Sequence, residues 1–333
     1  MTTHLLVANP TAQSGKNRER IERALSWLHD HGVAAMLLPT LPEGLTIARV
    51  TETLDSTPSV RVVIAMGGDG TFREVAAGLY QSQAQKRVAL AMLPTGTAND
   101  QGKSFGLDAS PSALERNLQV ILDGKETELD VGVYRRRSST SVDFFFDSAG
   151  WGLSARVLAE RNRSRKVVET LGPLKEIYRD HAVYAGAFLK TFLESYVIDD
   201  RLTVELVLDG RPMTLSGITD LVVKNTRVYA GAWVFDRTSL HNDGMFELIP
   251  FKGKLDWTSK AIVDLEGNPV TEEALNEIGI EHSKPLRAAK MELTFHSATD
   301  GAPLAAQLDG EEWPAEHHVT IEVVPRGVRL IVP

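Results

Sequence analysis

The fold is decided by the stretch Arg61-Val-Val-Ile-Ala-Met-Gly-Gly-Asp-Gly-Thr-Phe-Arg-Glu-Val75. An apolar, β-branched run ends abruptly in Gly67-Gly68-Asp69-Gly70-Thr71, and a helical pattern follows. This order predicts a buried strand, a tight turn and the N-terminus of a helix. Such a turn offers backbone N–H groups and the positive end of the helix dipole to an anion, and glycines let the backbone approach it closely.

Asp69 is the unusual residue of this turn. A carboxylate repels a bound phosphate unless a cation bridges the two groups. The turn therefore indicates a Mg2+-nucleotide rather than a bare anion.

The residues before position 131 alternate between strand and helix patterns. Strands are expected at His4–Ala8, Val33–Leu38, Arg61–Met66 and Val88–Leu93, and helices at Arg18–His31, Thr46–Leu54 and Pro111–Leu122. This alternation predicts a parallel sheet covered by helices, with its ligand beyond the C-terminal ends of the strands. Three loops fall at such ends: Asn9–Lys16, Gly67–Thr71 and Pro94–Gly102.

The pattern changes after Val131, where strand-like runs dominate. They lie at Ser141–Phe146, Leu202–Leu208, Thr219–Val223, Met245–Pro250, Lys290–Phe295 and Val319–Val324, and a helix is expected at about Leu174–Leu193. We expect a nucleotide-binding α/β domain over residues 1–130 and an antiparallel β-sandwich over residues 131–333. The last segment would return toward the first domain.

Composition narrows the class of protein. The 333 residues are 43% hydrophobic and 24% charged, which is typical of a soluble globular protein. There is no cysteine, so thiol nucleophiles and Cys-based metal sites are excluded, and a cytoplasmic location is expected. No run approaches the roughly eighteen apolar residues of a membrane span. A net charge of −8 argues against general nucleic-acid binding.

Several further segments allow both a structural and a chemical interpretation. Asn9 and Lys16 bracket a loop that can hold phosphate oxygens, although it lacks the first glycine of a Walker A loop. Thr97, Asn99 and Asp100 follow the fourth strand and can face the same site. Asp309-Gly-Glu311 is either an ordinary hairpin turn or carries a general base. The match Gly150-Trp-Gly-Leu-Ser-Ala155 lacks the strand and acid that a dinucleotide site requires.

Taken together, the ordered motifs are specific. They are Asn9-Pro-x-x-x-Ser-Gly-Lys16, Gly67-Gly-Asp-Gly-Thr71, Leu93-Pro-x-Gly-Thr-Ala-Asn-Asp100, Leu129-Asp-Val-Gly132, Ser148-Ala-Gly150, Asn242-Asp-Gly244 and Leu308-Asp-Gly-Glu311. In this order the chain resembles the diacylglycerol kinase catalytic-domain family, which includes soluble bacterial lipid kinases and sphingosine kinases. The resemblance spans nearly the whole chain. It implies that ATP binds, and that the active site lies, in the cleft between the two domains.

The resemblance implies roles for individual residues. Gly67, Gly68, Asp69, Gly70, Thr71 and Thr97 would contact ATP, with Thr40 as a further nucleotide contact, while Asn9 and Asn99 remain candidates from their loops. Asp309 would accept the proton. Lys16, Asp69, Asp100, Asp130 and Glu311 would form a charged network around catalytic Mg2+. Four carboxylates gathered in one cleft would need a divalent cation to stay ionised together.

Some positions depart from the family pattern. A structural metal is implied at Asp243 and the Met245 carbonyl, but Leu240 stands where an acidic ligand is expected. Ala230-Gly-Ala232 replaces a glycine triplet, and Gln101-Gly102 replaces an aromatic–small pair. These changes fall where the acceptor pocket is expected.

The sequence thus predicts an ATP- and Mg2+-dependent kinase that phosphorylates diacylglycerol or a related lipid alcohol. The alternatives are a kinase with a non-lipid acceptor, as in NAD kinases, and a non-catalytic lipid or nucleotide sensor. A lipid substrate implies peripheral association with a membrane surface, and a homodimer is allowed. Two basic clusters, Arg135–Arg137 and Arg161 with Arg163, Arg165 and Lys166, are either solvated surface or a docking face for anionic lipid.

Overall fold

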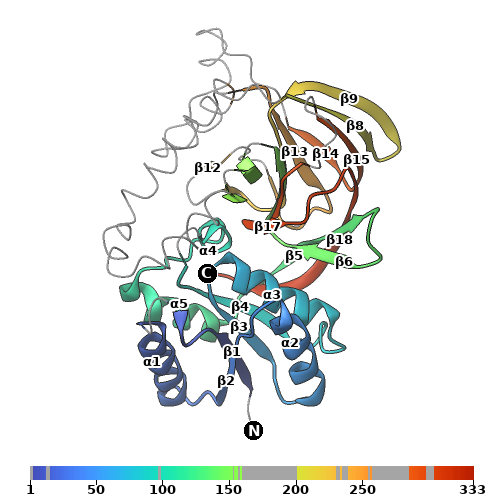
Figure 1. Cartoon of the computed structure of the whole chain (residues 1–333). Coiled ribbons are helices and arrows are strands. Elements are labelled where there is room, and N and C mark those ends of the chain that lie inside the picture. Colours follow the sequence, from blue (N-terminus) through green and yellow to red (C-terminus); the bar gives the residue numbers. More distant parts are fainter. Residues whose placement is uncertain are drawn as a thin grey trace.

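A computed structural model gives the fold of the chain. It describes residues 3–12, 16–96, 99–152, 154–156, 158–159, 201–229, 233–234, 239–253, 256, 285–297 and 304–333. The helix expected at Leu174–Leu193 and the basic residues 161–166 lie outside this part. Figure 1 shows an α/β body that holds both termini and a β body above it.

The α/β body is built on four parallel strands in the order β2-β1-β3-β4. These are β1 (His4–Ala8), β2 (Ala35–Pro39), β3 (Val62–Gly67) and β4 (Ala89–Pro94). The helices are α1 (Lys16–Asp30), α2 (Leu45–Ser56), α3 (Asp69–Gln81), α4 (Asp100–Ser104) and α5 (Leu114–Asp123), the last preceded by a 3-10 turn at Pro111–Ala113. The predicted alternation is confirmed, with element ends shifted by one or two residues.

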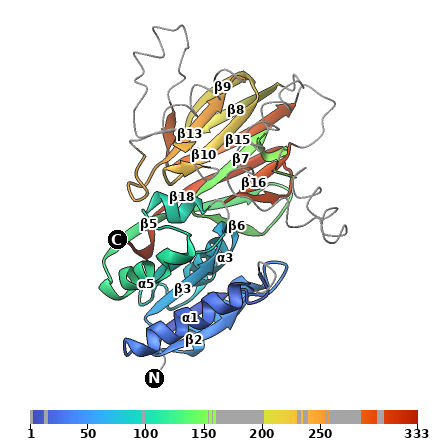
Figure 2. The same cartoon turned by 90° about the vertical axis from the view of Figure 1, so that its left-hand side faces the viewer.

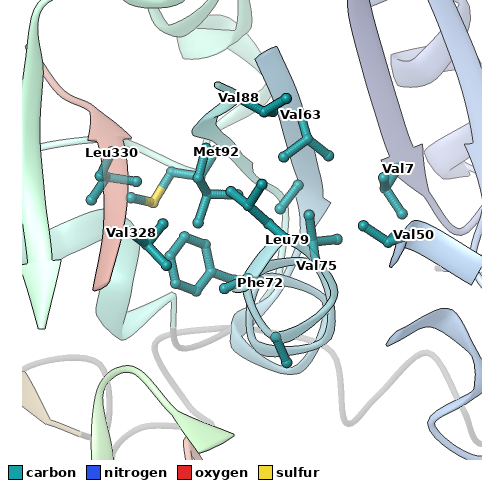
Figure 3. Close-up of a cluster of buried hydrophobic side chains, with 14 of the residues drawn as sticks. Val7, Val50, Val63, Phe72, Val75, Leu79, Val88, Met92, Val328 and Leu330 are labelled. Atoms are coloured by element: carbon teal, nitrogen blue, oxygen red, sulfur yellow. The ribbon is translucent and has the colours of Figure 1, made fainter. Parts of the chain in front are cut away.

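Helices cover both faces of this sheet. On one face α2 and α3 pack over Val63 and Met92, and on the other α1 and α5 pack over Ile64 and Leu93. Successive strand residues therefore point into different cores, which explains the continuous apolar run before Gly67. Figure 3 shows Phe72, Val75 and Leu79 of α3 in the first of these cores, which also contains Val328 and Leu330 from the end of the chain.

The β body has two facing sheets. One has six strands in the order β14-β13-β10-β7-β16-β17, while the other continues the parallel sheet through β18, β15, β8 and β9, with β5 and β6 beside β18. The strands are β5 (Glu126–Arg136), β6 (Val142–Phe145), β7 (Ser148–Gly152), β8 (Leu202–Leu208), β9 (Arg211–Ile218), β10 (Asp220–Lys224), β13 (Phe246–Phe251), β14 (Leu286–Ala288), β15 (Lys290–Ser297), β16 (Ala306–Leu308), β17 (Glu311–Trp313) and β18 (His318–Ile331), with a small separate pair β11 (Val228–Tyr229) and β12 (Trp233–Val234).

A shared apolar core joins the two sheets. It includes Tyr134, Trp151, Phe246 and Phe295, all buried. The buried side chains of β8 alternate along the strand, as expected where one face of an antiparallel strand packs inward. The expected two-domain α/β and β-sandwich architecture is confirmed, and Figure 2 shows the sandwich from the side.

β18 links the two bodies. Ten of its 14 residues pair antiparallel with β5, with a bulge between Val324 and Val328, and Leu330 pairs with Leu90 of β4 in parallel. The predicted strand Val319–Val324 is only its first half. A domain boundary at residue 130 stays a prediction, because β5 runs through that position. Within the described residues, no helix is both long and apolar enough to cross a membrane.

Candidate active site

The turn after β3 is held by close backbone contacts. β3 ends at Gly67, whose carbonyl accepts a hydrogen bond from the Thr95 N–H at 2.8 Å. A Cβ on Gly96 would lie 2.5 Å from the Cα of Gly68, so the two loops touch backbone to backbone. A Cβ on Gly67 would meet the Thr71 side chain in the same way. Gly67 and Gly96 therefore have no room for a side chain, and the turn is closely packed at these two positions.

The side chain of Asn99 bonds to the backbone of its own loop, which follows β4. Its backbone is left-handed (φ 52°), its Oδ1 accepts the Gly96 N–H at 2.9 Å, and its Nδ2 donates to the Gly96 carbonyl at 2.6 Å. Asp100 then opens α4, and its side chain is buried. The candidate ATP contact Thr97 lies outside the described residues.

Asp69 begins α3 and faces α4. Its Oδ1 accepts the Gln101 N–H at 3.2 Å. Burial, followed by the charge of Asp147, raises the pKa of Asp69 to about 6, although hydrogen bonds from the N–H groups of Gln101 and Asp100 act in the opposite direction. A buried carboxylate in a negative surrounding of this kind is suited to a divalent cation.

Asp309 occupies the tight turn between β16 and β17, with a left-handed backbone (φ 48°). Its carboxylate is buried and accepts three backbone N–H groups: those of Asp147 at 2.8 Å and Ser148 at 2.9 Å on Oδ1, and that of Phe146 at 2.9 Å on Oδ2. Burial, followed by the charge of Asp147, raises the pKa of Asp309 to about 7 despite these bonds. A carboxylate poised near neutrality suits a general base.

A buried ion pair beside Asp309 was not predicted. The Lys224 Nζ lies 2.6 Å from Oδ1 of Asp147, and both side chains are at most 3% exposed. The Thr226 hydroxyl donates to the same oxygen, and Lys224 also donates to the Val228 carbonyl at 2.7 Å. The only sequence signal was a charge at the end of each of two apolar runs, Phe144–Asp147 and Leu221–Lys224.

Glu311 connects the two halves of the site. Its Oε2 lies 3.0 Å from Nη2 of Arg73 on α3, and a Cβ on Gly70 would lie 2.0 Å from its Oε1. The Arg73 guanidinium also stacks over Trp313, 4.7 Å from the ring centroid. The Asp309–Glu311 turn is thereby seated on the first turns of α3. Arg73 was not recognised from sequence, where it appeared only as a helical residue.

Asp130 is buried on β5 and bonded to backbone. Its Oδ1 accepts the Arg326 N–H at 2.6 Å, and its Oδ2 accepts the Gly244 N–H at 2.7 Å. Burial raises its pKa, and these two bonds act in the opposite direction. The carboxylate therefore fastens the bulge of β18 to the turn at residues 242–245. Its place in a charged network around Mg2+ stays a prediction.

The residues around Asp243 do not fit the structural metal that the family implies. Asp243 pairs with the Arg287 guanidinium, whose Nε also donates to Oε1 of the buried Glu247 at 3.1 Å. The other oxygen of Glu247 accepts the Ser239 hydroxyl at 2.6 Å, and Leu240 is exposed. Within the described part of the chain, no three His, Asp or Glu residues gather in a way that could hold a metal ion. A guanidinium thus supplies the positive charge here.

The remaining predicted nucleotide contacts lie at the ends of β1 and β2. The Asn9 Oδ1 accepts the N–H and hydroxyl of Thr11 at 3.0 and 2.8 Å, so this side chain orders its own loop. The Thr40 N–H donates to the Ala8 carbonyl at 3.0 Å, which places Thr40 beside that loop. Lys16 is the first residue of α1, and its side chain lies outside the described part.

Comparison with known proteins agrees with this architecture. Residues 3–134 match the family model of the diacylglycerol kinase catalytic domain. The "Probable lipid kinase YegS-like" of Enterobacter sp. (strain 638) is 27% identical over 316 residues, covering 95% of this chain and 92% of the relative. The "Probable lipid kinase YegS" of Salmonella gallinarum is 28% identical over 333 residues, covering 99% and 95%.

The fold also has solved counterparts. A crystal structure of a diacylglycerol kinase from Bacillus anthracis str. Sterne aligns with a TM-score of 0.68 at 20% identity, covering 99% of this chain and 97% of that one. The predicted resemblance to the diacylglycerol kinase catalytic-domain family is therefore confirmed, and the relatives are lipid kinases by name.

Proposed function

We propose that this chain, whose residues 3–134 match the family model of the diacylglycerol kinase catalytic domain, is an enzyme that transfers the γ-phosphate of ATP to a hydroxyl of diacylglycerol or a related lipid alcohol. One observation carries the proposal. A buried carboxylate, Asp309, with a pKa raised to about 7, stands on a turn that Glu311 seats against the glycine-rich turn of α3.

The glycine-rich turn is the nucleotide side of the site. The N–H groups of Gly68–Thr71 and the start of α3 would bind the phosphates, as helix N-termini commonly do. Asp69, which is partly exposed, and Asp100, which is buried, would hold Mg2+, which prefers carboxylate oxygens together with phosphates. When bound, Mg2+ would neutralise negative charge on the phosphates.

The Asp309 turn is the acceptor side. As the acceptor oxygen forms its bond to the γ-phosphorus, its proton passes to an oxygen of Asp309, and the bond to the β–γ bridging oxygen breaks to release ADP. Three N–H groups hold the Asp309 carboxylate in one orientation, so it is positioned before the acceptor arrives.

A transfer assay with γ-labelled ATP and Mg2+ tests this function. The acceptors are diacylglycerol, monoacylglycerol, a sphingoid base and NAD, each with wild type and Asp309→Asn. Label in an extracted lipid, absent with Asp309→Asn, supports the proposal. Label on NAD alone would establish a non-lipid acceptor. Nucleotide binding without transfer to any acceptor would establish a sensor.

Action at a membrane surface of the cytoplasm follows from a lipid acceptor and is part of the proposal. The described basic cluster offers it little support, because Arg135 pairs with Glu322 at 3.3 Å and Arg136 with Asp143 at 3.6 Å. Residues 161–166 lie outside the described part, so docking through them stays a prediction, as does a homodimer. Binding to vesicles of increasing anionic lipid content tests the docking.

A further inference from the structure

The segment 224–226, at the end of β10, is hydrogen-bonded to the segment 146–148, at the start of β7. Lys224 pairs with Ser148 in the ladder between these strands. The Asn225 N–H donates to the Asp147 carbonyl and its Nδ2 to the Phe146 carbonyl, both at 2.8 Å. The Lys224 ammonium and the Thr226 hydroxyl both bond Oδ1 of Asp147. The segment 224–226 therefore holds the Asp147 side chain and the carbonyl groups of Phe146 and Asp147 in place.

The same β7 segment orients Asp309. The N–H groups of Phe146, Asp147 and Ser148 all point at its carboxylate, and the Asp309 N–H donates back to the Ser148 carbonyl at 2.8 Å. We propose that Lys224, acting through Asp147, is a positioning residue that holds Asp309 in orientation and offsets the negative charge beside it. This inference rests on the proposed function, in which Asp309 is the base.

The need for a cation follows from the charges near Asp309. Asp147 is 2% exposed and its N–H touches Asp309, so an unpaired Asp147 would place a second carboxylate charge beside the base in a medium that screens poorly. Among the described residues, the charged groups on these elements are Asp147 before β7, Asp220 and Lys224 on β10, Asp69, Arg73 and Glu74 on α3, and Glu311 and Glu312 on β17. Arg73 pairs with Glu311, and Lys224 pairs with Asp147.

A purely structural ion pair is the competing explanation. Buried pairs often add little net stability, while removing one partner destabilises the fold. Melting temperature therefore does not distinguish the two roles. The acid limb of the kcat–pH profile does, since it follows protonation of the base rather than the stability of the fold.

The test measures kcat for lipid phosphorylation from pH 5 to 9 in the full-length protein at saturating MgATP. Wild type should lose kcat about tenfold per pH unit below the pKa of its base. Lys224→Met leaves Asp147 uncompensated, so its acid limb should move to higher pH by about one unit, which is about a tenfold loss at pH 6. Asp147→Asn removes the repulsion, so its limb should move to lower pH. KM for ATP should stay within about twofold in both.

Matched variants keep the outcome decisive. Lys224→Arg retains the charge and should keep the wild-type limb, and Lys290→Met, at an exposed site in the same sandwich, should change nothing. If Lys224→Met does not fold, the kcat–pH profile of Asp147→Asn still tests the proposal. If the acid limb of the kcat–pH profile moves in neither Lys224→Met nor Asp147→Asn, while Asp309→Asn is inactive, the positioning role is overturned and the proposed function stands. An active Asp309→Asn would instead overturn the proposed function.

Discussion

The two sides of the proposed active site are built by different physical means. On the nucleotide side, loops at the ends of adjacent parallel strands touch through backbone, and the Cα of Gly68 leaves no room for a side chain on Gly96. On the acceptor side, the buried carboxylate of Asp309 accepts hydrogen bonds from N–H groups about 160 residues away in sequence, and the Asp147–Lys224 ion pair lies beside it. We infer that steric changes should disturb the first side, and changes of charge the second.

Asp69 is an exception to this comparison, because it is a charged residue on the nucleotide side. Asp69→Ala should lower kcat/KM by about 10³-fold, because the cation loses one of its two proposed protein ligands. Calorimetry should show weaker MgATP binding and a melting temperature no lower than that of wild type, because a buried carboxylate with a raised pKa has been removed. Unchanged MgATP affinity would place the cation elsewhere.

Gly96→Ala tests the steric character of the nucleotide side. Its Cβ would meet the Gly68 backbone at 2.5 Å, so the loops must separate, at a cost of about 1–3 kcal/mol in unfolding free energy and a loss of ATP affinity. Gly68→Ala is the matched control. Its Cβ would meet only an ordinary contact at 3.4 Å, so stability should hold, and any loss of ATP affinity would report on phosphate approach. Equal stability of both variants would contradict the packing described for this turn.

The Asp243–Arg287–Glu247 cluster tests whether charge pairing in the sandwich replaces a metal. Arg287→Met leaves the buried Glu247 without its cation and should lower the free energy of unfolding by about 1–2 kcal/mol, discounted because Arg287 is 43% exposed. Chelator should leave the melting temperature of the wild-type protein unchanged. A wild-type protein that melts earlier in chelator would show that a cation stabilises this region after all.

A further expected effect is a pH dependence of stability. Between pH 4 and 7 the folded protein holds a proton on Asp309 that the unfolded chain has released, so stability contributed by this group falls as pH rises through that window. Asp309→Asn lacks the effect. Its melting temperature relative to wild type should therefore be higher at pH 8 than at pH 4, and a constant difference across this range would contradict the burial assigned to the base.

The same contrast explains what sequence could predict. The glycine-rich turn, its strand and its helix were predictable because they are contiguous, and Asp309 could be proposed as the base because its motif is local. The Asp147–Lys224 pair was not, because it depends on the register in which β7 and β10 pair. Arg287 was missed for a similar reason, since β14 meets β13 only in the folded sheet. Asn9 and Asn99 were assigned to the nucleotide, while their side chains bond within their own loops.

The central claim is that Asp309 accepts a proton during phosphoryl transfer to a lipid. Its most direct test compares wild type and Asp309→Asn in two measurements: the calorimetric Kd for MgATP and the rate of label transfer from ATP to diacylglycerol. We predict an unchanged Kd and a transfer rate lowered by about 10²–10⁴-fold, the usual contribution of a general base. Near wild-type transfer by Asp309→Asn would contradict the claim.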